Sequence, residues 1–152
     1  MGFTHYWRLR KGEKKDLSGC LENIKKVLDK YKDLIQREWD DKKTPLINKN
    51  LIRFNGIGDN GYETFWFEYP PKKEESNKEG FEFNFCKTAR KPYDIVVCEC
   101  LLILKEYLNE DMKLSSDGMI SVGSEDENWG KAIEEVEKIG VDIIPILVVD
   151  KL

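Results

Sequence analysis

Residues 95–104, with the sequence IVVCECLLIL, restrict the fold more than any other segment, because only Glu99 interrupts an otherwise apolar run. Pro92 precedes the run, and proline is well tolerated in the first turn of a helix. The pattern predicts a helix from Pro92 to Leu108. A helix that is hydrophobic on all sides is buried, so we expect the rest of the chain to pack around it.

Two further helices are predicted to be amphipathic. The first covers residues 16–39, where charged side chains occupy the face opposite an apolar stripe. That stripe consists of Leu17, Leu21, Ile24, Val27, Leu28, Tyr31, Leu34, Ile35 and Trp39. The other begins at Ser124, where Glu127 would complete a capping box, and ends at Gly140.

Five segments have the composition and alternation of β-strands: 3–9, 51–55, 62–68, 81–87 and 112–116. Phe81, Phe83 and Phe85 share one face of their strand, a pattern typical of antiparallel strands that are covered on one side. Residues 141–149 could form an edge strand or a tail packed on the core. The order of elements predicts one α+β domain over residues 1–152. We expect a mainly antiparallel sheet of about five strands and three helices, one of them buried.

Composition excludes several classes of protein. The formal net charge of −4 excludes a wholly basic coat on nucleic acid, so nucleic acid is disfavoured as a partner, and so is a polybasic membrane contact. No apolar run reaches the roughly 18 residues of a membrane span, and no signal peptide is visible. The four cysteines lack the paired spacing of a zinc site. We expect a cytoplasmic protein with reduced thiols and with no metal or cofactor; homo-oligomer formation is left open.

Gly56, Gly58 and Gly61 match the pattern G-x-G-x-x-G. The dinucleotide-binding fingerprint requires a helix after this loop, but a strand-like segment follows here. Protein kinases place such a loop between strands, but the chain lacks their H-R-D and D-F-G motifs. A structural hairpin is therefore favoured, although its backbone N–H groups could line a ligand pocket.

The segment 86–94, CKTARKPYD, most resembles a binding site. It contains three cations, Lys87, Arg90 and Lys91, where a strand leads into the buried helix. Because a helix N-terminus carries partial positive charge and free N–H groups, this corner suits a phosphate or carboxylate. Thr88 could donate a further hydrogen bond.

An internal ion-pair network explains the same residues equally well. The third predicted helix is acidic and could neutralise the basic corner. Asp94, in the first turn of the buried helix, could hold Arg90 in place or compete with an anion. Both interpretations stay open at this stage.

Other candidate residues complete the predicted site. His5 is either a hydrogen-bonded core residue or a general base, and Asp117 is either part of a turn or an alternative base. Tyr6, Trp7 or Tyr93 could stack on a base ring, and Asn55 is a further candidate ligand contact.

Several runs taken together resemble a small uncharacterised family found in phages and scattered microbial genomes. These runs are GFTHYW from Gly2, FNGIG from Phe54, ETFWF from Glu63, FCKTARKPYD from Phe85 and SSDG from Ser115. The resemblance covers the chain to about Trp129 and implies no known activity. It implies that a shared pattern includes His5, Lys87, Thr88, Arg90, Lys91, Tyr93, Asp94 and Asp117. A phage setting implies an accessory role against host defence, such as holding a signalling nucleotide.

These observations support three functional hypotheses. The first is a binding domain for an anionic, nucleotide-like small molecule that sequesters a host defence signal. The second is a small enzyme acting on a phosphorylated or nucleotide substrate, with His5 or Asp117 as the acid–base group. The third is a protein-interaction module that inhibits a host protein.

Overall fold

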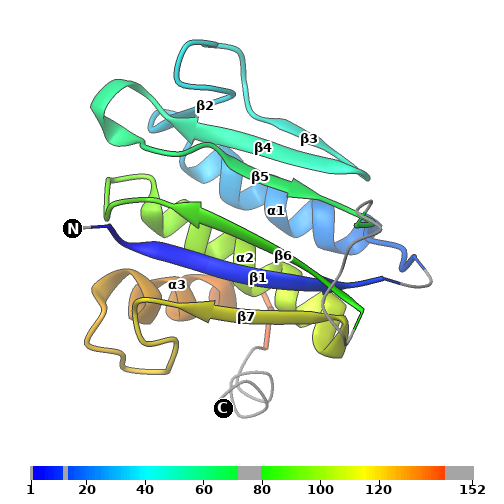
Figure 1. Ribbon diagram of the computed structural model, residues 1–152. Helices are drawn as coiled ribbons and strands as arrows, with labels where there is room; N and C mark the ends of the chain where they lie inside the picture. Colours follow the sequence, from blue (N-terminus) through cyan, green and yellow to red (C-terminus); the bar gives the residue numbers. More distant parts are fainter. Residues whose placement is uncertain (1, 12–13, 72–79, 143–152) are drawn as a thin grey trace.

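The computed structural model describes residues 2–11, 14–71 and 80–142. Its helices lie on one side of two antiparallel sheets (Figure 1). In the first sheet, β1 (Thr4–Arg10) lies between β6 (Phe81–Lys87) and β7 (Met112–Ser116). In the second, β4 (Leu51–Gly56) pairs with β2 (Ile35–Gln36), β3 (Leu46–Asn48) and β5 (Phe65–Glu68). The predicted α+β class is confirmed.

The apolar run forms the centre of the molecule, as predicted. It belongs to α2 (Asp94–Leu108), and every residue from 94 to 105 is buried. Helices α1 (Ser18–Lys30) and α3 (Glu127–Lys138) pack against α2, and α2 also contacts β7. Each fully buried leucine or isoleucine here contributes about 1.5–3 kcal/mol through removal of apolar surface from water.

The predicted first helix is too long. It ends at Lys30, and Ile35 and Gln36 form the short strand β2 instead. The apolar stripe continues past the helix end because Leu34 and Ile35 still face the core, but they do so from a turn and a strand. The third helix begins at Glu127, capped by Asp126 rather than Ser124, since the Asp126 side chain accepts a hydrogen bond from Trp129 N.

The glycine-rich loop connects two antiparallel strands, as the hairpin interpretation predicts. β4 pairs with β5, and a short 3₁₀ helix, η1 (Gly58–Asn60), lies between them. The Asn55 side chain fastens this loop: its Oδ1 accepts from the backbone N–H groups of Gly56 and Tyr62. A Cβ at Gly61 would lie 2.1 Å from Asn55 Oδ1, so this glycine is needed for close backbone approach.

Strand β6 buries the face that carries Glu82 and Cys86 and exposes two phenylalanines on its other face. Glu82 and Cys86 point into the protein and are buried, whereas Phe83 and Phe85 point away from the helices and are 47% and 54% exposed. Alternation along β6 fixes this outcome, since one face must meet the helices and the other must not. Strand β1 directs Trp7 and Leu9 inward, together with the polar side chain of His5.

Among the described residues, no helix has both the length and the apolarity needed to cross a bilayer. All four cysteines are free and buried. A second 3₁₀ helix, η2 (Asn109–Asp111), links α2 to β7. Most of the predicted strand or tail at 141–149 lies outside the described residues; of its first residues, Val141 is buried.

Candidate functional site

The outer face of the sheet β6-β1-β7 carries a row of aromatic rings. The ring centroids of Phe83 and Phe85 are 6.0 Å apart, and those of Phe83 and Tyr6 are 6.1 Å apart with an interplanar angle of 27°. Tyr6 faces Phe85 in the β1–β6 register. Solvent-exposed phenylalanines on β6, an edge strand of this sheet, lose the free energy that burial would supply, and contiguous exposed apolar surface marks interaction sites.

Cations surround these rings. The guanidinium carbon of Arg8 lies 5.5 Å from the centroid of Phe83, and that of Arg10 lies 5.1 Å from the centroid of Phe81. Lys113 Nζ, on β7, lies 4.8 Å from the centroid of the same Phe81 ring. Arg10 forms an ion pair with Asp111, whereas no ion pair joins Arg8 to any other described residue. The outer face therefore combines flat apolar rings with positive charge.

A groove of about 720 Å³ runs over this face. Its lining includes Tyr6, Arg8, Phe83, Lys113 and Ser115 together with the carboxylate of Glu110, so aromatic, cationic and hydroxyl groups meet there beside one acid. Phe85 and Lys87 lie on the same face but outside the groove. Cavities of roughly 300–1,000 Å³ hold small-molecule ligands in other proteins. We define this region, from β6 across β1 to β7, as the aromatic–basic face.

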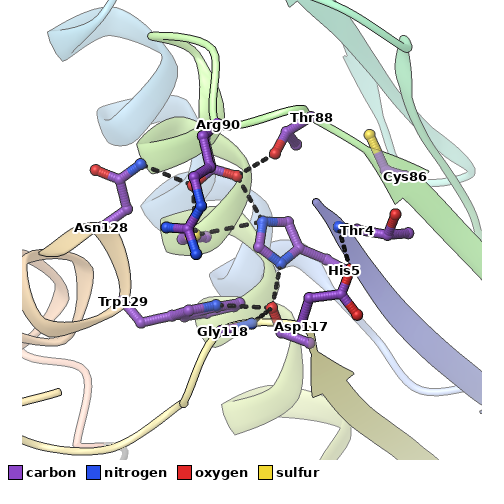
Figure 2. A network of polar contacts seen from close by, with 12 residues as sticks. Thr4, His5, Cys86, Thr88, Arg90, Asp117, Gly118, Asn128 and Trp129 are labelled. Carbon is purple, nitrogen blue, oxygen red and sulfur yellow. Dashed lines mark hydrogen bonds and ion pairs between the residues drawn. The ribbon is translucent and has the colours of Figure 1, made fainter. Parts of the chain in front are cut away.

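The predicted candidate His5 lies on the opposite, inner side of β1. Figure 2 shows it within a polar network built by the sheet and two helices. Its Nε2 lies 2.6 Å from Asp94 Oδ1 at the start of α2, and its Nδ1 lies 2.7 Å from Ser116 Oγ at the end of β7. His5 is 0% exposed. Both ring nitrogens are engaged, as the core-residue interpretation of His5 predicts.

Asp94 collects most of the hydrogen bonds in this network. Besides His5, it accepts from the Thr88 hydroxyl and, at 2.7 Å, from Asn128 Nδ2 of α3. Burial by itself raises the pKa of the carboxyl group, but the hydrogen bonds from these three side chains outweigh burial. They hold the pKa of Asp94 below its ordinary value of 3.8. Asp94 is therefore an ionised, buried acceptor that ties β1, α2 and α3 together.

Ser116 ends the chain of contacts Ser116–His5–Asp94, an order of residue types that also occurs in serine hydrolases. Here, however, the Ser116 Oγ accepts from Gly118 N and from Trp129 Nε1, each at 3.0 Å. With both lone pairs engaged, the hydroxyl can donate its proton to His5 Nδ1, which places the ring proton on Nε2, toward Asp94. The serine is thus fully hydrogen-bonded, a state that suits a structural role better than nucleophilic attack.

Cys98 of α2 brings a sulfur atom close to the same pair. Its Sγ lies 3.7 Å from His5 Nε2, so His5, Asp94 and Cys98 form a cluster of metal-ligand types. Ligand atoms around a tetrahedral zinc ion lie about 3.3 Å or more apart, whereas His5 Nε2 and Asp94 Oδ1 are 2.6 Å apart. That separation is a hydrogen bond, and burial raises the pKa of the Cys98 thiol. The predicted absence of a metal site stays a prediction.

The basic corner divides into two parts. Arg90 NH1 lies 2.7 Å from Asp126 Oδ2, at the start of α3, and its guanidinium carbon lies 3.8 Å from the centroid of Phe3. Thr88 is buried against Asp94. The contacts of Arg90 and Thr88 are therefore those of an internal ion pair and an internal hydrogen bond. Asp126, and not Asp94 as predicted, holds Arg90. Lys91 is partly exposed, and Lys87 lies at the end of β6, on the side of Phe85.

A strained turn holds Arg90 in position. Ala89 and Arg90 both have positive φ angles, 52° and 56°, and Lys91 N donates to Thr88 O across the turn. Each left-handed residue other than glycine costs roughly 1–2 kcal/mol. The ion pair and the stacked ring at Arg90 offset part of that cost, although the Arg90 side chain is 58% exposed.

The remaining predicted site residues lie apart from one another. Trp7 and Tyr93 are fully buried, so neither ring can stack on a ligand in this conformation. Trp7 Nε1 has no hydrogen-bond partner among the described residues. Asn55 fastens the glycine-rich loop. Asp117 accepts from Thr4 N and from the Tyr6 hydroxyl, so its contacts are with the sheet and not with His5.

The most exposed aromatic residues of this sheet are not among the predicted site residues. The alternation of Phe83 and Phe85 predicts one covered face of the strand but does not indicate which face it is. A signal was present: β1 has an apolar inner face and carries Tyr6, Arg8 and Arg10 on its outer face. A strand paired beside it in register must present its odd-numbered phenylalanines next to those residues.

Comparison of the chain with protein-family models, with curated proteins and with solved structures finds no match.

Proposed function

We propose that the protein binds an anionic, nucleotide-like ligand on the aromatic–basic face. The observation that supports this proposal is the pair of half-exposed rings, Phe83 and Phe85, on the edge strand β6, with the Arg8 guanidinium beside Phe83. A planar base stacks on such rings, and a phosphate pairs with the neighbouring cation. The proposed ligand class is the one predicted from sequence, but the proposed site differs from the basic corner.

Each part of the face has a role in this proposal. Phe83, Phe85 and Tyr6 supply flat surfaces for the base, and base–aromatic stacking contributes about 1–3 kcal/mol per base. Arg8 offers a guanidinium that no acid neutralises among the described residues. Ser115, which also lines the groove, offers a hydroxyl to a sugar or phosphate oxygen.

The basic corner contributes at one end of the face. Lys87 continues the row of Phe83 and Phe85 along β6, because alternate residues of a strand share a face. The proposal therefore retains Lys87 from the predicted site and gives Arg90 a structural part. Sequestration of a host defence nucleotide, which the family resemblance implies, is the biological form that this binding would take.

A protein partner is the second candidate, because exposed aromatic residues and arginine are also enriched at protein–protein interfaces. The third hypothesis, an enzyme that uses His5, receives less support, since the side chain is buried and both ring nitrogens are engaged. A binding experiment separates the first two candidates.

We would titrate the purified protein with AMP, GMP, CMP and UMP by isothermal calorimetry and repeat the titration with Phe83→Ala and Phe85→Ala. Trp39→Ala is the matched control, because Trp39 is 72% exposed but lies in the loop after β2. Loss of one stacking ring is expected to weaken binding about 5- to 150-fold, the equivalent of about 1–3 kcal/mol. The proposal fails if no nucleotide binds, or if both Phe variants bind as the wild type does.

A further inference from the structure

We infer that the aromatic–basic face accommodates a short single strand of nucleic acid, with successive bases on successive rings, in preference to a free mononucleotide. This inference rests on the proposed function and specifies its ligand class. It follows from the spacing of the rings, the distribution of the cations and the openness of the sheet.

The face offers more than one aromatic ring to a ligand. Phe85 and Phe83 are 6.0 Å apart between centroids, and Phe83 and Tyr6 are 6.1 Å apart. Rings about 6 Å apart on a sheet can each take one base, as in single strands bound on open sheets whose aromatic residues stack two or three bases.

The cations extend further than one phosphate group. Lys87 lies at one end of β6 and Arg8 pairs with Phe83 near the middle, whereas Arg10, at the other end, already forms an ion pair with Asp111. Because a strand rises about 3.4 Å per residue, the four steps from Lys87 to Phe83 span about 14 Å. Positive charge distributed over that length matches a backbone with several phosphates.

The global charge does not oppose this local arrangement. The net charge of −4 led to the prediction that nucleic acid is disfavoured. However, the acidic helix α3 belongs to the helical layer, whereas the aromatic–basic face is on the other side of the strands (Figure 1). The net charge therefore gives no long-range attraction for a polyanion, and binding depends on contact at this one face.

Fluorescence anisotropy with fluorescein-labelled U8 and T8 tests the inference, with unlabelled UMP as competitor and a labelled eight-base-pair duplex as a further probe. At least one labelled single strand is expected to bind at least tenfold more tightly than UMP and tenfold more tightly than the duplex. Phe85→Ala should weaken binding, and circular dichroism verifies that the variant is folded. If it does not fold, Phe83→Leu takes its place.

Salt dependence separates phosphate contacts from stacking. For single strands the slope of log K against log salt is about −0.7 per neutralised phosphate. Lys87→Ala should therefore make the slope less negative by about 0.7, whereas Phe85→Ala should leave it unchanged. Lys26→Ala is the control, since Lys26 is exposed on α1, in the helical layer.

The outcomes distinguish the inference from the proposed function. If UMP competes as well as an unlabelled single strand, or if the duplex binds equally well, the inference is wrong while nucleotide binding on this face stands. If neither UMP nor any oligonucleotide binds, both are wrong. If single strands bind but Lys87→Ala and Phe85→Ala change nothing, the strand lies elsewhere and the inference is overturned.

Discussion

Replacement of the buried carboxylate in Asp94→Ala should be among the most destabilising single changes outside the apolar core. Three donors converge on this side chain: His5 Nε2 at 2.6 Å, Asn128 Nδ2 at 2.7 Å and the Thr88 hydroxyl. Each buried donor left without an acceptor costs about 1–3 kcal/mol. Partial relaxation reduces the sum for the three donors, so we expect a total loss of about 3–5 kcal/mol.

That loss corresponds to a large shift in melting temperature. For a chain of this length 1 kcal/mol is equivalent to roughly 2–4 °C, so the variant should melt about 6–20 °C below the wild type. Differential scanning calorimetry and urea unfolding at pH 7 measure the difference. Asp33→Ala is the control, because Asp33 is exposed and should change stability by less than about 0.5 kcal/mol.

Lowering the pH should reduce the difference in free energy of unfolding between the wild type and Asp94→Ala. Because the folded protein holds the pKa of Asp94 below 3.8, the stabilisation that this carboxylate supplies is complete above the unfolded pKa. It disappears as pH falls through the folded pKa. The gap between wild type and Asp94→Ala should therefore be constant between pH 7 and about 5, and should narrow below about pH 4.

A difference in unfolding free energy of less than about 1 kcal/mol between the wild type and Asp94→Ala at pH 7 would refute this reasoning. A difference that does not become smaller below about pH 4 would refute it as well. If Asp94→Ala does not fold, Asp94→Asn replaces it. Asparagine keeps the volume and one acceptor oxygen, so we expect a smaller loss, again with no contribution from ionisation.

Two other predictions concern the glycine-rich loop and the thiols. Gly61→Ala should destabilise the protein more than Gly58→Ala does in urea titrations, because a Cβ at Gly61 meets Asn55 whereas Gly58 has open space and only the strain of φ +56°; equal losses would contradict the packing role of Gly61. Burial raises the pKa of the Cys20 and Cys86 thiols to about 12, so Ellman's reagent at pH 8 should label neither in the folded protein and both in guanidinium. Rapid labelling of either thiol under native conditions would contradict their burial.

Long, strongly patterned elements could be predicted from the sequence. The bounds of β6 and β7 agree with the expected segments, and α2 begins two residues after Pro92 and ends at the expected Leu108. The predictions for these elements are correct because strict alternation, or a long apolar run, favours a single secondary structure. Ile35 shows the limit: an apolar residue at helical spacing can meet the core equally well from a short strand.

The candidate site was harder to predict because partners distant in sequence determine which face of a strand is buried. Nothing within residues 81–87 states whether the phenylalanines or Glu82 and Cys86 meet the helices. The pairing of β6 with β1 decides it. Similarly, the sequence alone placed His5 and Asp94 among the candidates, but their direct hydrogen bond depends on β1 crossing the start of α2.

The central position of β1 has a consequence for synthesis of the chain. Arg10 pairs with Phe81 and His5 pairs with Ser116, so both neighbours of this strand are translated long after it. At 5–20 residues per second, a ribosome needs roughly 5–20 s to add the intervening segment. During that interval, an aromatic-rich strand with two open edges can associate with other chains. Holdase chaperones should therefore increase the soluble yield of this protein more than later-acting folding factors do.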